Sequence, residues 1–398
     1  MFFKPVRVIL MVGFLFSIVW CGVGFAKEPV MIGLTTSLSG TFAPQGEEVR
    51  RAVEFAIEEA NAKGGVDGRE VKVQLNDDES TPDGARKGME KCARSGYNLL
   101  IGPIASSMSL TLAQNLERWD AMYCIILSKA DKLTGEACIP RMFRINPSDS
   151  MDLAMMSSWL RTINEKKFAI LAVDYAWGRD SAEFFKKTAP SMGKEVKTEL
   201  FVPMGTKDFA PYIAQLADSG AEAVWVALVG RDIMAFAKQA DEFGLKKKMR
   251  IVGHAFIFNF VVNATGQASE GIWGNIGYSP SISTERNKQY VAAWKKKFDR
   301  EPTENEGQAY NGTQVIFEGV KAAGSVKPVD VARALSGATI ETIFGPAKMR
   351  AEDHQLMLPN YIGQVEKIND QYKVVVEKSF DASVNPPPST DCKMGNLQ

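Results

Sequence analysis

Few residues of this sequence have the spacing that catalysis requires. His254 and His354 are the two histidines, and neither has sequence neighbours that would complete a catalytic triad. The sequence contains no phosphate-binding loop and no H-E-x-x-H, C-x-x-C or G-x-S-x-G motif. Asp77 and Asp78 could form an acid–base pair, but adjacent strand residues point to opposite faces, which favours a polar strand end. These patterns indicate a binding protein without cofactor or metal rather than an enzyme.

The residues best suited to binding lie in two loops that follow expected strands. Residues 37–40 (SLSG) and residues 102–107 (GPIASS) each separate a strand from a helix. Ligands of open α/β sheets bind beyond the carboxyl ends of the strands. Hydroxyl and backbone N–H groups at a helix N-terminus stabilise a carboxylate, so we expect Ser39, Ser106 and Ser107 to contact an anionic ligand. The alternative is that Ser106 or Ser107 is only an N-cap.

Alternating strands and helices are needed to position these loops. The expected strands are at 30–35, 71–75, 98–101, 122–127, 168–173, 223–228 and 250–252. Apolar residues at helical spacing predict helices at 47–62, 82–95, 107–118, 151–164, 181–189, 209–219, 233–243, 284–298, 306–323 and 329–335. This alternation predicts βαβ units and parallel sheets, in two similar runs at 30–146 and 150–272.

Length, charge and composition limit the class of protein. A chain of 398 residues is long enough for two domains. The 47 basic residues equal the 47 acidic residues, so the formal net charge is zero, which argues against nucleic-acid binding. Hydrophobic residues make up 45% and charged residues 24% of the chain, as in a globular protein rather than a disordered one.

The first 26 residues have the features of a secretory signal peptide. Lys4 and Arg7 are basic, residues 8–19 are apolar, and residues 24–26 (GFA) end in a small residue, so cleavage is predicted after Ala26. The apolar run is shorter than the roughly 20 residues that span a membrane, which makes an uncleaved anchor the less favoured alternative. The chain is therefore expected to be exported.

Short motifs follow one another along nearly the whole exported chain, from about residue 30 to residue 375. They are SLSG, EEANAKGGVDGR, NDDESTP, GPIASS, LTGEAC, FRINPSD, GTKDF, TGQASEG and AAGS. In this order they resemble the leucine/isoleucine/valine-binding family, the type I periplasmic solute-binding proteins of ABC importers. The resemblance implies an α/β fold of two Rossmann-like lobes joined by a three-segment hinge. It also implies a location in the periplasm, a monomeric state, a small-molecule solute and an ABC permease in the inner membrane as partner.

The resemblance also implies lobe boundaries. We expect the first lobe at 27–148 and 275–348, the second at 149–274 and 349–380, and an extended tail at 381–398 that returns to the first lobe. A sensory protein of the same fold, which reports its ligand to a receptor, is the alternative function.

Family positions that contact the ligand fall on several residues of this chain. They are Gln45, Ala105, Ser106, Ser107, Ser128, Lys129, Trp177, Arg231 and His254. Lys129 replaces a threonine and His254 replaces the acid that pairs with an amino acid's ammonium group. A buried ammonium beside a lysine with no carboxylate to pair with is disfavoured. The expected ligand is therefore an aromatic or aliphatic carboxylate without an amine, with an amino acid or amide as the alternative.

The exported chain has four cysteines, for which the sequence leaves three pairings open. Some members of the family join a cysteine after the LTG turn to one in the C-terminal tail. The resemblance therefore implies a Cys138–Cys392 disulfide. Cys92 and Cys124 have two alternatives, a second disulfide or two buried thiols.

Overall fold

The computed structural model describes residues 1–2 and 27–397. The proposed signal peptide and its cleavage after Ala26 lie largely outside the described residues. Within the described part of the chain, no helix has the length and apolar character needed to cross a membrane.

The first sheet has five parallel strands in the order β2-β1-β3-β4-β5. They are β1 (Val30–Thr36), β2 (Val71–Asp77), β3 (Leu99–Gly102), β4 (Met122–Ile125) and β5 (Met142–Arg144). Every residue of β3, β4 and β5 is buried, as expected of parallel strands covered on both faces.

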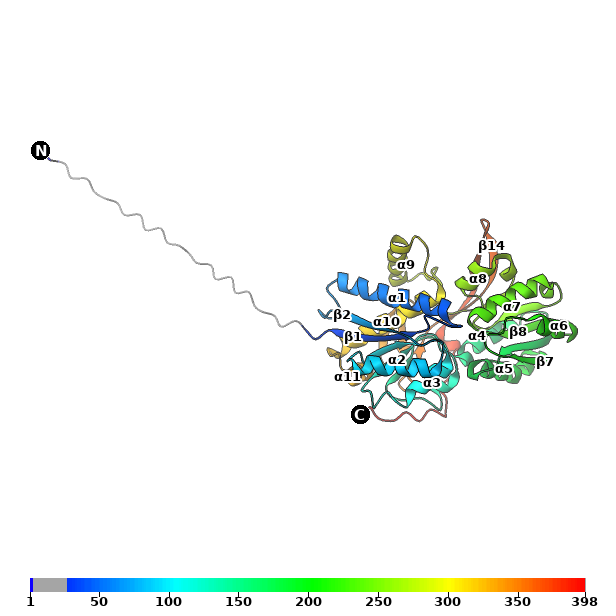
Figure 1. Ribbon diagram of the computed structural model, residues 1–398, viewed down its shortest axis with the longest axis horizontal. Helices are drawn as coiled ribbons and strands as arrows, with labels where there is room; N and C mark the ends of the chain where they lie inside the picture. The colour runs from blue at the N-terminus through cyan, green and yellow to red at the C-terminus, as the bar shows by residue number, and fades with distance from the viewer. Residues whose placement is uncertain (3–26, 398) are drawn as a thin grey trace.

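Helices cover both faces of this sheet. Figure 1 shows α1 and α10 on one face and α2 and α3 on the other. The helices of this half are α1 (Ala43–Ala62), α2 (Pro82–Arg94), α3 (Ser106–Ala113), α9 (Glu285–Phe298), α10 (Glu304–Ala323) and α11 (Pro328–Leu335). A capping box formed by Thr303 and Glu306 fixes the start of α10, which matters because the first turn of this helix reaches the site described below.

The second sheet has seven strands in the order β15-β14-β10-β9-β8-β6-β7. They are β6 (Lys167–Val173), β7 (Glu195–Val202), β8 (Ala223–Ala227), β9 (Arg250–Gly253), β10 (Trp273–Ile276), β14 (Asn360–Ile368) and β15 (Gln371–Phe380). Strands β14 and β15 are antiparallel additions to a parallel sheet. The helices of this half are α4 (Asp149–Leu160), α5 (Ala176–Thr188), α6 (Ala210–Asp218), α7 (Gly230–Glu242) and α8 (Asn259–Thr265).

Smaller elements complete the described chain. A third, antiparallel sheet contains β11 (Thr339–Thr342), β12 (Gly345–Met349) and β13 (Leu356–Met357). Short 3₁₀ helices are η1 (Asp131–Thr134), η2 (Ala189–Met192), η3 (Leu245–Lys247), η4 (Gly266–Ser269) and η5 (Ala382–Val384). The predicted α/β class with parallel sheets is confirmed.

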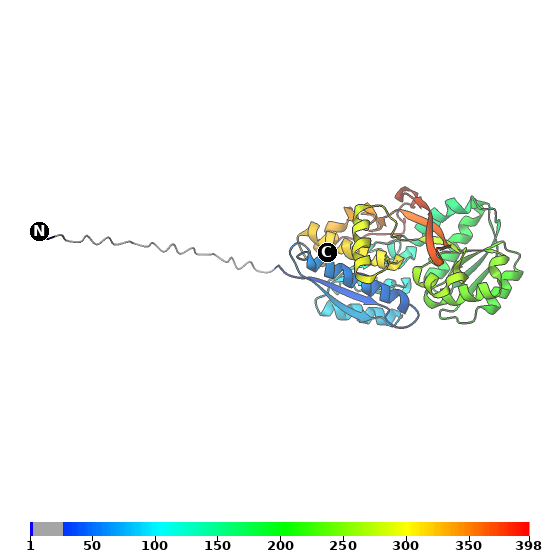
Figure 2. The same cartoon turned by 90° about the horizontal axis from the view of Figure 1, so that it is seen from above.

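The two large sheets lie in separate halves of the molecule, shown from two directions in Figures 1 and 2. We propose that each sheet is the core of one lobe. The chain then crosses between lobes after β5, after β10 and between β13 and β14. Strand pairing shifts two expected boundaries under this division. The first lobe was expected to end at residue 348, but β13 pairs with β12, so this lobe extends to residue 357. The first segment of the second lobe was expected to end at residue 274, but β10 continues to residue 276 and belongs to the second sheet.

Arg144 joins the two first-half segments that lead into the first and third crossings. Its side chain is buried, and its Nε donates to Gln355 Oε1 at 2.6 Å while Nη1 donates to the carbonyl of Ala130 at 2.7 Å. Gln355 Nε2 in turn donates to the carbonyl of Asn146 at 3.0 Å. A buried charge is tolerated here because its N–H groups meet oriented oxygen acceptors.

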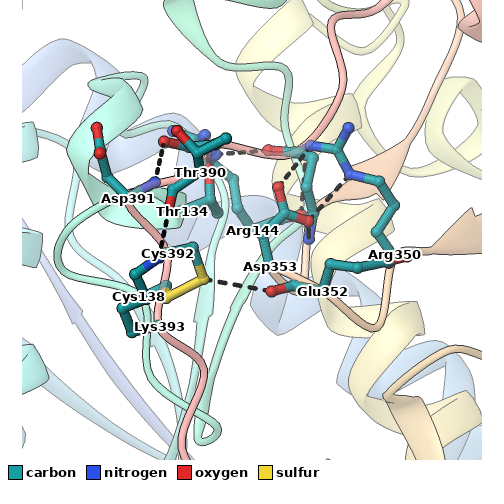
Figure 3. The surroundings of a disulfide bond; sticks show 12 residues. Thr134, Cys138, Arg144, Arg350, Glu352, Asp353, Thr390, Asp391, Cys392 and Lys393 are labelled. Atoms are coloured by element: carbon teal, nitrogen blue, oxygen red, sulfur yellow. Dashed lines mark hydrogen bonds and ion pairs between the residues drawn. A yellow bond between two sulfur atoms is a disulfide. The ribbon is translucent and has the colours of Figure 1, made fainter.

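The disulfide joins Cys138 to Cys392, with a Cα–Cα distance of 5.5 Å, so the implied pairing is confirmed (Figure 3). Cys92 and Cys124 are buried thiols. Before it reaches Cys138, the tail is held at the third crossing, where Arg350 Nη1 donates to the carbonyl of Pro386 at 2.7 Å and Asn385 Nδ2 donates to the carbonyl of Leu358 at 3.1 Å. The tail thus runs from β15 to the loop after β4.

Candidate functional site

A cavity lies where strands of both large sheets end. It encloses about 470 Å³ of free space, including its opening. Its lining from the first half consists of Phe42, Gln45, Ile104, Ala105, Ser106, Leu127, Lys129, Asn305 and Gln308. Its lining from the second half consists of Tyr175, Trp177, Leu228, Val229, Ala255 and Phe258. Most of these residues follow the carboxyl end of a strand, where α/β sheets place their ligands.

Five of the residues expected at the ligand line this cavity: Gln45, Ala105, Ser106, Lys129 and Trp177. They come from α1, from the loop after β3, from the loop after β4 and from the start of α5. The structure therefore brings together residues that are far apart in the sequence and belong to both halves.

The other five expected residues do not line the cavity. Ser39 and Arg231 are exposed, and Ser107 is half-buried beside the lining residue Ser106. The Ser128 hydroxyl is buried and occupied, because it donates to the carbonyl of Ile104 at 2.9 Å and pairs with Ser109 Oγ at 2.7 Å. His254 is buried behind the lining, as described below.

Ser106 combines a helix N-terminus with an available hydroxyl donor. Ala105 occupies the N-cap position of α3 without a side-chain cap, so the alternative that Ser106 or Ser107 serves only as an N-cap is wrong. Ser106 Oγ accepts from the backbone N–H groups of Lys129, at 3.2 Å, and Ala130, at 3.1 Å. Both acceptor positions are filled by these bonds, so the hydroxyl hydrogen is left to donate to a ligand oxygen.

Lys129 is not an isolated cation. Its side chain is 6% exposed, and its Nζ forms an ion pair with Asp152, which is 2% exposed and lies on α4 of the other half. The premise that no carboxylate lies beside Lys129 is therefore wrong. Burial raises the pKa of Asp152, but the Lys129 and His254 partners outweigh it and hold that pKa below its ordinary value. Asp152 is thus ionised, and the pair joins the two halves beneath the cavity.

His254 extends this buried network. Its Nε2 lies 3.2 Å from Asp152 Oδ2 and 3.2 Å from Asp149 Oδ1, and its Nδ1 lies 2.7 Å from Ser181 Oγ. Ser181 Oγ accepts from Trp225 Nε1 at 3.1 Å, so its own hydrogen is directed to Nδ1 and the imidazole proton sits on Nε2. Burial lowers the pKa of His254. A neutral histidine that positions Asp152 is therefore its role in this structure.

Three of the six lining residues of the opposite wall are aromatic: Tyr175, Trp177 and Phe258. Trp177 is 3% exposed, and its Nε1 donates to Asp149 Oδ1, which fixes the orientation of the indole ring. Tyr175 lies 6.2 Å from Trp177 between ring centroids, and Phe258 stacks on Phe260 at 5.6 Å. This wall offers flat apolar surface to a solute, as an aromatic ring requires.

Three amide side chains line the cavity with unused acceptors. The oxygens Gln45 Oε1, Asn305 Oδ1 and Gln308 Oε1 are all buried and lack a hydrogen-bond partner. Sequence reasoning missed Asn305 and Gln308. The available signal was their spacing of three residues, which places both on one face of α10, although the helix was predicted to begin only at 306.

Two acidic residues lie behind these amides. Burial and the neighbouring Glu306 raise the pKa of Glu48 to about 7, and burial raises the pKa of Glu304 to about 8 although Lys129 opposes that change. Asn305 Nδ2 donates to Glu48 Oε2 at 2.7 Å, and Gln308 Nε2 donates to Glu304 Oε1 at 3.2 Å. The amides are thereby anchored through their nitrogens.

The sequence also matches a known family. A model of the periplasmic binding protein family matches residues 29–371. The chain belongs to the periplasmic binding protein family. This membership implies a periplasmic location.

Curated relatives of this periplasmic binding protein cover most of its length. A Leu/Ile/Val-binding protein homolog 2 of Brucella abortus is 27% identical over 354 residues, which cover 88% of this chain and 93% of the relative. A Leu/Ile/Val-binding protein homolog 4 of Brucella melitensis is 24% identical over 391 residues, which cover 91% of this chain and 92% of the relative.

Solved structures share the fold. A solute-binding protein of an ABC transporter from Rhodopseudomonas palustris BisB5, in complex with 3,4-dihydroxybenzoic acid, has a TM-score of 0.81 and 26% identity. The match covers 88% of this chain and 97% of that structure. The closed form of a leucine-, isoleucine-, valine-, threonine- and alanine-binding protein from Brucella ovis has a TM-score of 0.82 and 22% identity, with 92% and 99% of the two chains covered.

Proposed function

We propose that this protein is the solute-binding component of an ABC importer. In this proposal it captures a small aromatic carboxylate between its lobes and delivers it to a permease in the inner membrane. The observation that carries the proposal is the Ser106 hydroxyl at the N-terminus of α3, facing a cavity whose other wall contains Tyr175, Trp177 and Phe258. We expect export with cleavage after Ala26 and action as a monomer, without cofactor or nucleic acid.

The charge balance supports a carboxylate bound by neutral donors. Lys129 is already paired with Asp152, so a ligand carboxylate would be held by the Ser106 hydroxyl and free backbone N–H groups, with Lys129 adding a partly compensated positive charge. The similar structure from Rhodopseudomonas palustris BisB5, whose ligand is 3,4-dihydroxybenzoic acid, supports the same class of solute.

Contacts between the two halves suggest how binding drives closure. Lys129 and Asp152 meet across the halves, and Asn259 Oδ1 accepts from the Glu304 backbone N–H at 3.3 Å. A solute that touches both walls interacts fully only when the lobes are together, so it shifts the population toward the closed form. The permease would then recognise the closed surface.

Calorimetry and thermal shift with benzoate test the proposal. Micromolar affinity corresponds to about −8 kcal/mol, and binding to the folded state alone raises the melting temperature. Ser106→Ala removes a hydrogen bond to a charged group, worth about 1.5–3 kcal/mol, and should weaken benzoate binding by roughly 10- to 100-fold. Ser107→Ala, one residue away and outside the lining, is the matched control.

An amino acid is the second candidate ligand, because Asp152 places an ionised carboxylate near Lys129. Leucine and valine therefore belong in the same titrations. Tight binding of either one, with benzoate and its derivatives inert, would contradict the aromatic-acid proposal.

A further inference from the structure

Three unsatisfied acceptors gathered at one cavity indicate what the solute offers them. The exposed fractions of Gln45, Asn305 and Gln308 are 6%, 1% and 4%. An acceptor buried without a partner costs about 1–3 kcal/mol, and such atoms are uncommon in folded proteins. A solute that carries hydrogen-bond donors would satisfy these oxygens.

The orientation of two of the amides follows from their neighbours. Asn305 and Gln308 direct their NH₂ groups to Glu48 and Glu304, and Glu304 Oε1 also accepts from the backbone N–H of Gly277 at 2.9 Å. The amide oxygens are therefore the atoms left for a ligand. Both amides lie within the first five residues of α10, and this helix packs beside the α1 helix that carries Gln45.

The three amide oxygens and the Ser106 hydroxyl, which is the proposed donor to the ligand carboxylate, reach the cavity from different helices. Gln45, Asn305 and Gln308 belong to α1 and α10, whereas Ser106 begins α3, and Figure 1 shows these helices on opposite faces of the first sheet. One small molecule reaching both sets needs an anionic end and separate donor groups. A flat ring between the two suits the aromatic wall from the other half.

Because the three acceptors are uncharged, they favour a neutral donor group on the solute over a charged one. Amide oxygens carry no net charge, and burial holds the pKa of Glu304 at about 8, so this carboxyl group is largely protonated near neutral pH. An ammonium group needs an ionised partner when it leaves water, whereas a phenolic hydroxyl needs only an acceptor. Hydroxyl groups on the ring match this site better than an amine.

We propose that the solute is a ring-hydroxylated aromatic carboxylate, and that Gln45, Asn305 and Gln308 accept hydrogen bonds from its hydroxyl groups. This inference rests on the proposed function and specifies its substrate class. A site built to bond a hydroxyl group discriminates strongly against an analogue that lacks it, because its polar groups then remain unpaired.

A matched ligand series tests the inference on the exported wild-type protein. Calorimetry would compare 3,4-dihydroxybenzoate, 4-hydroxybenzoate, benzoate and 4-fluorobenzoate, the last of which has a small substituent that cannot donate. We expect 4-hydroxybenzoate to bind at least about 10-fold more tightly than 4-fluorobenzoate, as one added hydrogen bond predicts. Equal affinities for these two ligands, or a preference for 4-fluorobenzoate, would overturn the inference while leaving the proposed function intact.

Variants then assign the effect to the amides. Gln308→Met and Gln45→Met should reduce the ratio of 4-hydroxybenzoate to 4-fluorobenzoate affinity toward one. Gln314→Met on the same helix, outside the cavity lining, should keep the wild-type ratio. An unchanged ratio in both cavity variants overturns the assignment, and failure of every aromatic acid to bind overturns this inference together with the proposed function. Tight binding of leucine identifies an ammonium as the donor and also overturns the inference.

Discussion

The two walls of the cavity use different chemistry. The first half contributes the polar side chains of the cavity, Gln45, Ser106, Lys129, Asn305 and Gln308, which we call the polar wall and which lie among the apolar residues Phe42, Ile104, Ala105 and Leu127. The apolar wall, from the second half, consists of Tyr175, Trp177, Leu228, Val229, Ala255 and Phe258. The polar wall holds directional groups that distinguish one solute from another, whereas the apolar wall covers any flat solute of suitable size. Under the proposed function, we expect selection among solutes to depend mainly on the first half and coverage of the solute mainly on the second.

The ion pair that joins the two walls gives the largest expected effect. Lys129→Met leaves the ionised Asp152 buried without its partner and should lower the free energy of unfolding by about 3–5 kcal/mol. Chemical denaturation checks this change. The double variant Lys129→Met with Asp152→Leu should recover most of the loss, because both charges are then absent. A double variant as unstable as the single one would contradict this account.

Truncation of a side chain in the apolar wall tests whether this wall contributes to selection between solutes. Phe258→Ala should weaken benzoate and 4-hydroxybenzoate binding by the same factor, roughly 30-fold, because it removes about 2 kcal/mol of apolar contact. Calorimetry with both ligands checks that the factors agree. Phe243→Ala, at a residue that is 53% exposed, is the control. If Phe258→Ala weakened only the binding of 4-hydroxybenzoate, both walls would contribute to selection, which contradicts this division.

The edge where the walls meet gives a direct test of closure. Gly230 begins α7 with φ +52°, and a Cβ added there would lie 2.4 Å from the carbonyl oxygen of Thr41 in the other half. Gly230→Ala should therefore weaken every ligand by about 10-fold, through overpacking in the closed form. Gly220→Ala has φ +70° and no atom within 4 Å, so it shares the backbone strain without the contact. Equal affinities in the two variants would show that Gly230 does not limit closure.

The carboxyl groups behind the polar wall give an effect that depends on pH. Burial raises the pKa of Glu304 from 4.5 to about 8, so the folded state keeps a proton that the unfolded state releases first. The contribution of this group to stability is full below about pH 4.5 and is lost as pH rises toward 8. As the pH rises from 5 to 8, the free energy of unfolding of Glu304→Gln should increase relative to that of the wild type by about 3 kcal/mol, which denaturation at each pH measures. A difference independent of pH would contradict the raised pKa.

Much of the fold could be predicted because parallel strands are buried on both faces. Residues 99–101 of the predicted strand 98–101 and residues 168–173 form continuous apolar runs, and both runs lie in buried strands. Strands β7 and β15 were missed because they lie at the edges of the second sheet, and charged residues interrupt their apolar pattern. Their placement depends on pairing with distant strands, which local periodicity does not report.

The site could be predicted only in part for a similar reason. Strand-end loops identified Ser106, and the family resemblance identified Lys129 and Trp177, all of which line the cavity. Asn305 and Gln308 lie in a helix that is buried over most of its length, so the sequence does not show which turn reaches the ligand. Asp152 was missed because its contact with Lys129 depends on how the two halves meet.

We expect the tail to limit how far the two halves can open. It accompanies the third crossing, where residues from both halves hold it, and it ends in the covalent Cys138–Cys392 link. The tail thus adds a fourth connection beside the third crossing, held by hydrogen bonds at one end and by the disulfide at the other. We expect this side to stay narrow throughout each cycle, so that solute enters and departs by the side where Gly230 meets Thr41.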